Sequence, residues 1–280
     1  MATPSASGRS LGAQLAQLRK AAGKNVRDAA EYLGCGHPKI SKIENGHVGI
    51  AYRELLALLD LYGVTDPAHR ERLVRLSRQR RQRFWWTPYS DFLSSSFSDY
   101  LYLEQTASRL RVFEPLLIPG LLQTPLYAAH QIADLYPVSR DDETMRSLVD
   151  VRVRRSQILA QGTRLDAILD EAVLCRPVAN ARIWRDQLDH LIKMAAEPNV
   201  TLRVVPFAAG QYHGGAGRFT VLSFSDLGGD VAYMEGVAGE VTLDAPAEVG
   251  LYNTMWDHIE TVALSPQETV DLIQEVRDHG

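Results

Sequence analysis

Cysteine is scarce in this sequence, and long apolar runs are missing. Cys35 and Cys175 lie far apart and outside any CxxC pair, so neither a disulfide framework nor a zinc site is predicted. Such cysteine usage is typical of a reducing compartment, and a cytoplasmic location is expected. Residues 1–10 lack the apolar stretch of a signal peptide, and the longest apolar run, 116–122, contains a Pro-Gly pair, so no membrane span is predicted.

Sequence signatures of catalysis are missing as well. The 280 residues contain no HExxH pair, no nucleophile elbow, no P-loop and no GxGxxG turn. These patterns place the groups that activate a metal-bound water or a serine, or that hold a nucleotide. The sequence therefore predicts a protein that is not an enzyme and that has no metal site and no cofactor.

The charge is unevenly distributed, although its total is only −4. Residues 1–84 contain 15 Lys and Arg against 7 Asp and Glu, a net charge of +8, whereas residues 85–280 contain 15 against 27, a net charge of −12. A basic segment joined to an acidic remainder is typical of a DNA-binding module tethered to a second domain. Hydrophobic residues make up 45% of the chain, which is enough for a buried core.

The basic segment shows the pattern of an all-α helix-turn-helix domain, assigned to residues 10–84 after a disordered tail at 1–9. Glycines and N-capping residues separate its apolar periods. Asn25 is expected to cap the second helix, with Asp28 completing a capping box. Helices are expected over 11–22, 26–33, 38–45, 52–62 and, strongly basic, 66–84. The second and third helices with the turn between them form the helix-turn-helix, whose later helix enters the major groove.

The third helix supplies most of the predicted contacts with double-stranded DNA. Ile40 and Ile43 are expected to face inward, which leaves the polar side chains to reach base edges or phosphates. Lys39 and Lys42 lie three residues apart and share a face. The predicted DNA-binding residues are Asn25, Arg27, His37, Pro38, Lys39, Ser41, Lys42 and Asn45.

The stretch LGAQLAQLRKAAGKNVRDAAEYLGCGHPKISKIENG resembles the phage-repressor-like, xenobiotic-response-element family of helix-turn-helix domains. In that family an arginine of the first helix pairs with the glutamate that ends the recognition helix. The resemblance implies that Arg19 and Glu44 are this structural pair. Val26 departs from the family, which often has a polar phosphate-binding residue there, so the phosphate role is assigned to Asn25 and Arg27.

Residues 85–280 are predicted to form a mixed α+β or α/β domain, and the aromatic run 84–86 marks its boundary. Helical and strand-like runs alternate without a strict repeat. Helices are expected over 97–112, 124–134, 141–160, 180–196, 246–263 and 266–278. Strands are expected over 165–169, 200–207, 218–224 and 231–235.

This second part also carries a resemblance. The segments VFEPLLIPGLLQTPLYA, VRVRRSQIL, AILDEAVLCRPV and VTLRVVPFAAGQYHGGAGRFTVLSF follow one another in order. Together they are similar to the large C-terminal domain of actinobacterial, antitoxin-like transcriptional regulators. The resemblance implies regulation of transcription and a small partner protein encoded nearby.

Four polar residues of the second part are candidates for a ligand or partner site: Gln123, Glu171, His213 and Glu235. His213 in a Gly-rich turn, with the two glutamates near it, would suit acid–base chemistry or metal binding. An exposed loop histidine explains the same pattern more simply. The PGLLQT segment at 119–124 is expected to be a rigid turn into a helix rather than a binding loop. The basic run 152–155 is expected to be a solvated helix face.

These patterns predict a sequence-specific transcriptional regulator that binds operator DNA as a homodimer, because one such head contacts too few base pairs for genomic specificity. Its C-terminal domain would sense a ligand or bind a small partner protein. Two alternatives stay open. The chain could be an antitoxin-like protein that sequesters a small partner and regulates its own synthesis, or an enzyme that carries a DNA-binding head.

Overall fold

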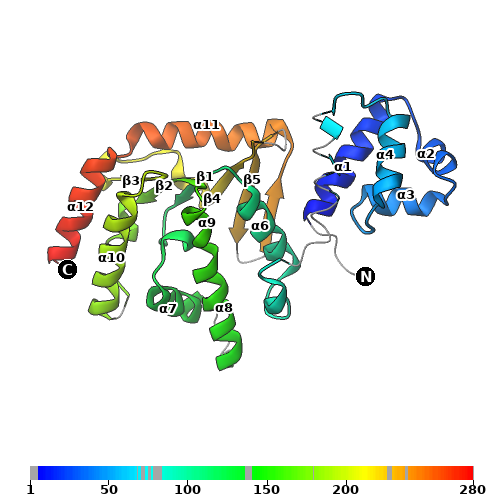
Figure 1. The fold of residues 1–280 in the computed structure, drawn as a ribbon. Helices are drawn as coiled ribbons and strands as arrows, with labels where there is room; N and C mark the ends of the chain where they lie inside the picture. The colour runs from blue at the N-terminus through cyan, green and yellow to red at the C-terminus, as the bar shows by residue number, and fades with distance from the viewer. Residues whose placement is uncertain are drawn as a thin grey trace. The chain divides into compact units, whose positions relative to one another are not determined.

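The computed structural model describes residues 6–67, 69–70, 73–74, 77, 84–135, 141–178, 180–225, 229–236 and 239–279. The chain divides into two compact units, residues 1–103 and 104–280 (Figure 1). The second unit thus begins later than the boundary expected after residue 84. No helix among the described residues is long and apolar enough to cross a membrane.

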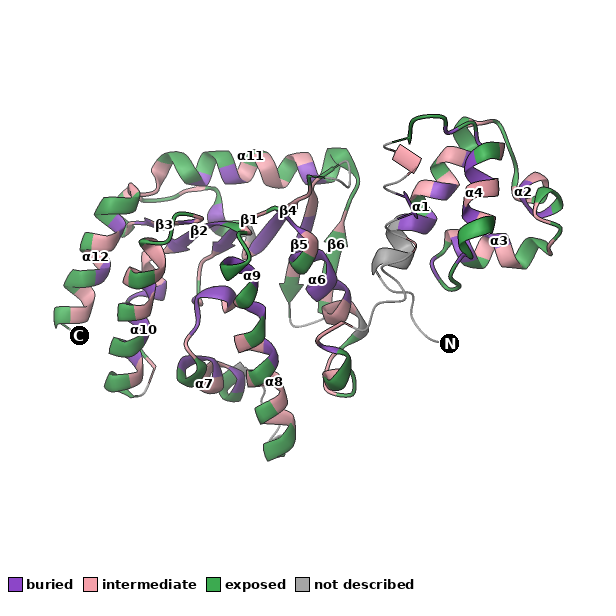
Figure 2. Ribbon diagram, viewed as in Figure 1, coloured by how far each residue is buried: buried purple, intermediate pink, exposed green. Residues whose placement is uncertain are grey.

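The first unit contains the expected all-α head. Its helices are α1 (Ala6–Ala21), α2 (Val26–Tyr32), α3 (His37–Glu44) and α4 (Tyr52–Leu61). The core is apolar, with Leu15, Ile40 and Leu55 fully buried among the four helices (Figure 2). Helix α1 already begins at Ala6, inside the segment 1–9 that the sequence indicated as a disordered tail.

Beyond α4, the expected basic helix over 66–84 is described only in part. Its backbone is helical at Pro67, 69–70, 73–74 and Ser77. Arg70 is among these residues, and the remaining arginines of the expected helix lie outside the described residues. After it come η1 (Thr87–Tyr89) and α6 (Ser95–Thr106). The aromatic run 84–86 packs on itself and on α6: Phe84 stacks on Trp86 with ring centroids 4.5 Å apart and meets the edge of Tyr102 at 5.7 Å.

The second unit is built on a mixed sheet of six strands in the order β3-β2-β1-β4-β5-β6. The first three strands pair in parallel, and β4, β5 and β6 continue the sheet in antiparallel pairs. Their bounds are β1 (Arg109–Glu114), β2 (Arg164–Asp170), β3 (Val200–Val205), β4 (Phe219–Ser223), β5 (Val231–Gly236) and β6 (Gly239–Leu243). The predicted mixed sheet with helical cover is confirmed.

Helices cover both faces of this sheet (Figure 1). On one face α11 (Pro246–Val262) inserts Trp256 and Ile259 into a core made with Phe113, Ile168 and Phe219. The other face is covered by α7 (Pro125–Leu135), α8 (Asp142–Arg155), α9 (Gln157–Ala160) and α10 (Ala181–Ala195). The last helix, α12 (Pro266–His279), protects the edge of β3, where Thr269 Oγ1 accepts a hydrogen bond from the Val204 amide at 3.0 Å.

Two element predictions were wrong. The helix expected over 97–112 ends at Thr106, and the residues after it form β1, the strand at the centre of the sheet. β1 pairs with β2 on one side and with β4 on the other, and this pairing of its backbone outweighs a weak helical period. The edge strand β6 was not predicted, because its residues are mostly exposed and carry little apolar alternation.

Candidate nucleic-acid interface

Helix α3 is held against α1 by a close backbone contact at Gly12. A Cβ atom at position 12 would lie 2.3 Å from the carbonyl oxygen of Glu44 and 2.6 Å from that of Ile43. Only glycine lets the two helices approach this closely, and α3 is fixed from below by the buried Ile40 and Ile43. The apolar periodicity did not reveal Gly12. A glycine inside a helix destabilises it by up to about 1 kcal/mol relative to alanine. A glycine at position 12 of a predicted helix therefore indicated that a neighbouring element packs closely there.

A bidentate ion pair fastens the end of α3 to α1. Arg19 Nε and Nη2 donate to the two carboxylate oxygens of Glu44 at 2.7 and 2.8 Å, and Nη1 donates to the Lys24 carbonyl at 2.9 Å. Both side chains are about nine-tenths buried. The hydrogen bond with Glu44 raises the pKa of Arg19 above its ordinary value. The structure thus brings together the two residues that the sequence proposed as a structural pair.

Asn25 and Arg27 lie at the exposed start of α2. The Asn25 side-chain oxygen accepts hydrogen bonds from the amides of Arg27 and Asp28 at 2.8 and 3.0 Å, and the Asn25 amide donates to Asp28 at 2.7 Å. This capping box confirms the predicted helix start and leaves the side-chain NH₂ of Asn25 to meet a phosphate. Arg27 pairs with Glu31 at 3.3 Å, but both side chains are about 70% exposed, so a phosphate can compete for the guanidinium.

The two predicted lysines of α3 differ in their surroundings. Lys39 is half-buried and forms an ion pair with Glu54 of α4, which lowers the pKa of Glu54. Lys42 is exposed, and no described carboxylate pairs with it. Of the other predicted DNA-binding residues, His37, Pro38 and Asn45 are exposed and Ser41 is half-buried. Lys42 is therefore the outward cation of α3, while Lys39 serves first to join α3 to α4.

In the second unit, the loop before α7 is rigid, as expected. Gln123 is buried, and its side-chain nitrogen donates to the Ile118 carbonyl at 2.7 Å. Gln187 of α10 accepts from the Thr124 amide and donates to the Leu122 carbonyl, both at 2.7 Å. Gln123 thus has a structural partner through its nitrogen, while its oxygen is buried without a hydrogen bond to any described atom.

The three other candidates of the second unit each contact different partners. Glu171 accepts a hydrogen bond from the Phe207 amide at 2.6 Å. His213 packs on His258 with ring centroids 4.6 Å apart, and Glu235 pairs with Arg218 at 3.1 Å. None of these contacts joins two of the three candidates. The described residues also contain no group of three or more His, Cys, Asp or Glu that could hold a metal ion.

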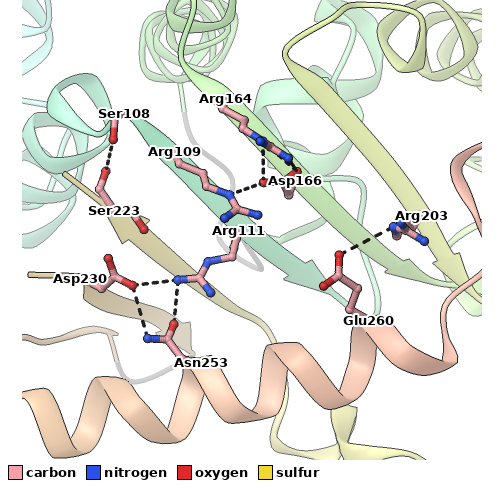
Figure 3. A network of polar contacts seen from close by, with 10 residues as sticks. All are labelled: Ser108, Arg109, Arg111, Arg164, Asp166, Arg203, Ser223, Asp230, Asn253 and Glu260. Carbon is pink, nitrogen blue, oxygen red and sulfur yellow. Dashed lines mark hydrogen bonds and ion pairs between the residues drawn. The ribbon is translucent and has the colours of Figure 1, made fainter. Parts of the chain in front are cut away.

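A network of charges that the sequence did not reveal lies on the α11 face of the sheet (Figure 3). Arg111 of β1 donates to Asp230 and to Asn253 of α11, both at 2.8 Å. At the start of β1, Arg109 pairs with the buried Asp166 of β2 at 2.5 Å. Arg111 thus ties β1 to α11, and Arg109 ties β1 to β2. Opposite charges in such close pairs are the pattern of a structural network.

The basic run of α8 is not the solvated helix face that the sequence indicated. Arg155 is 6% exposed and binds Glu104 at the end of α6 through two hydrogen bonds of 2.8 and 2.7 Å. Arg152 is half-buried against the backbone of Gly120. Only Arg154 faces solvent, beside Asp150 one turn earlier. The prediction failed because the period of α8 contains few apolar residues, so the buried face could not be distinguished.

Two family models match the chain. One, described as a helix-turn-helix domain, matches residues 10–73, and the other, described as a domain of unknown function, DUF5753, matches residues 97–275. No curated protein and no solved structure matches the chain.

Proposed function

The chain belongs to the DUF5753 family and carries a helix-turn-helix domain in front of that domain, and on this basis we propose that it is a sequence-specific DNA-binding transcriptional regulator. The observation that carries the proposal is the mounting of α3. Gly12 and the Arg19–Glu44 pair hold this helix against α1, and the Lys39–Glu54 pair holds it against α4. Its outer side presents Lys42, His37 and Asn45 to solvent, as major-groove recognition requires.

The proposed role of the second domain is to regulate, not to catalyse. Support comes from the separate contacts of Glu171, His213 and Glu235, whose side chains are engaged by a backbone amide, a histidine ring and an arginine. We also propose that the protein binds its operator as a homodimer in the cytoplasm, because one head reads too few base pairs to find a site in a genome.

The test of DNA recognition uses an operator selected by the full-length protein from a pool of random duplexes. Lys42→Ala should weaken binding to that operator by about 1–3 kcal/mol, or roughly 5- to 150-fold, if Lys42 reads a base. The exposed Lys20 of α1 provides the matched control, because Lys20→Ala removes the same charge away from α3. An unchanged operator affinity of a folded Lys42→Ala variant would contradict the placement of α3 in the groove.

The dimer is tested by salt dependence on two duplexes, one with the complete operator and one with a single half-site. Each neutralised phosphate contributes about −0.9 to the slope of log K against log salt. Two bound heads should therefore give nearly twice the slope of one. Equal slopes on the two duplexes, with one protein copy per operator in sedimentation, would rule out the proposed dimer.

A further inference from the structure

A cluster of charges lies on the α8 face of the sheet, at the carboxyl end of β1. Phe113 points into the core under α11, so the next residue, Glu114, points to the opposite face. The register pairs Phe113 with Phe219, which places Arg218 beside Glu114. Arg152 and Arg155 of α8 both reach Gly120, where an added Cβ would lie 2.7 Å from Arg152 Nη1 and 3.2 Å from Arg155 Nη1. Burial raises the pKa of Glu114, and the charges of these two arginines act against that rise.

Two of the three arginines in this cluster have partners. Arg155 forms the buried bidentate pair with Glu104. Arg218 binds Glu235 twice, through the carboxylate at 3.1 Å and through the backbone carbonyl at 3.0 Å, and lies 4.0 Å from Glu114. Arg152 has no such partner, and Glu114 has only the long 4.0 Å ion pair with Arg218 among the described residues. Glu114 Oε2 is buried without a hydrogen bond to any described atom.

Arg152 makes no hydrogen bond and no ion pair with any described residue, although its side chain is half-buried. Its guanidinium lies against Gly120, where a Cβ would come within 2.7 Å of Nη1. Burial, and then the charge of Arg155, lower the pKa of Arg152 to about 10. Part of the side chain remains solvent-accessible, so a solute can reach it.

Such a guanidinium is costly to the folded protein by itself. A half-buried charge without a hydrogen-bonding partner destabilises the folded state, and in proteins such an arginine is usually paired with a carboxylate or phosphate that accepts two parallel hydrogen bonds from it. Both oxygens of Glu104 accept hydrogen bonds from Arg155, and Glu104 forms no hydrogen bond with Arg152. The charges of Glu235, Glu104 and Glu114 favour the charged form of Arg152, but none of the three carboxylates forms a hydrogen bond or an ion pair with it, so its donors are left for an anion from solution.

We propose that Arg152 and Glu114 bind a small organic anion, whose oxyanion group pairs with the Arg152 guanidinium while a neighbouring hydroxyl or amine of the same molecule meets Glu114. Gly120 leaves space for the Arg152 guanidinium because it has no side chain. The hydrogen-bonded loop 118–124 holds Gly120 in place. That this anion controls operator binding rests on the function proposed above; the site itself does not.

The test is calorimetric titration of the full-length protein with inorganic phosphate, glycerol phosphate, succinate and serine at constant chloride-balanced ionic strength. Phosphates and carboxylates separate the two forms of the oxyanion, and the probes that carry a hydroxyl or amine test the contact with Glu114. We expect at least one probe to bind at one site per chain. Arg152→Met, which keeps an apolar stem beside Gly120, should weaken that binding at least tenfold, and Arg154→Met on the exposed side of α8 should not.

Thermal unfolding without the probe distinguishes a ligand site from a structural role. Arg152→Met should be at least as stable as the unsubstituted protein, because it removes an unpaired charge. A large loss of stability, the absence of binding by every probe, or equal binding by Arg152→Met would overturn the proposal. Operator affinity with and without the bound probe is measured separately: if it is unchanged, the anion does not control DNA binding, while the Lys42 experiment decides whether the protein reads DNA at all.

Discussion

The sharpest quantitative prediction concerns the carboxyl group of Glu114. Burial, as the largest cause, raises its pKa from 4.5 to about 7, while the nearby arginines act in the opposite direction. The folded protein therefore holds this proton more tightly than the unfolded chain. Its contribution to stability is fully present below pH 4.5 and is lost as the pH rises through about 7.

The expected size follows from the shift of 7 − 4.5 = 2.5 pH units. At about 1.4 kcal/mol per unit, ionised Glu114 destabilises the folded state by up to about 3.5 kcal/mol. Roughly 2 kcal/mol of this appears between pH 5.5 and pH 8, because the unfolded chain is already mostly ionised at the lower pH. Glu114→Gln removes the titration but keeps the shape, so its stability relative to the unsubstituted chain should rise by that amount across the interval.

The measurement is urea unfolding at both pH values in a chloride buffer. A Trp85→Phe, Trp86→Phe background leaves the signal to Trp184 and Trp256 of the second unit. Glu197→Gln is the matched control, since Glu197 is exposed and is not among the charges that act on Glu114, so this variant removes one carboxyl group and leaves the Glu114 titration in place. The reasoning is refuted if the stability difference between Glu114→Gln and the unsubstituted chain is the same at pH 5.5 and pH 8.

Three further predictions concern packing. Gly12→Ala should destabilise the head by at least about 1–3 kcal/mol in thermal unfolding, since its Cβ meets backbone oxygens; a head that melts unchanged would show that α1 and α3 are further apart. Gly250→Ala in α11 should instead stabilise the second unit by about 0.5–1 kcal/mol, because nothing lies within 4 Å of the added carbon; a loss of stability there would contradict the open space beside Gly250. Arg19→Ala should lower the free energy of unfolding by about 3–5 kcal/mol, because it leaves Glu44 buried and unpaired. The double variant with Glu44→Ala should recover part of that stability; if the single and double variants lose the same amount, the two side chains are not coupled.

Local chemistry made the head predictable from sequence. The spacing of Ile40 and Ile43 and the capping box of Asn25 each depend on residues that are close together in the sequence, and the structure contains both. The Lys39–Glu54 pair joins residues 15 positions apart on different helices. No local pattern could therefore predict that Lys39 pairs with a residue of α4. The same limit applies to β1. Arg109, Arg111 and Glu114 make this strand look like a polar amphipathic segment, and only its partners in the finished sheet explain why it is central.

The residues that hold α3 in position are different from the residues that can read DNA. Gly12, Arg19 and Glu44 fix its position without using any of its outward side chains. Substitutions at Lys42, His37 or Asn45 can therefore alter base preference at little expense to folding, since these side chains are exposed. A new operator is then reachable through single substitutions on one face, so duplicated copies of such a gene could diverge in target while keeping the same scaffold.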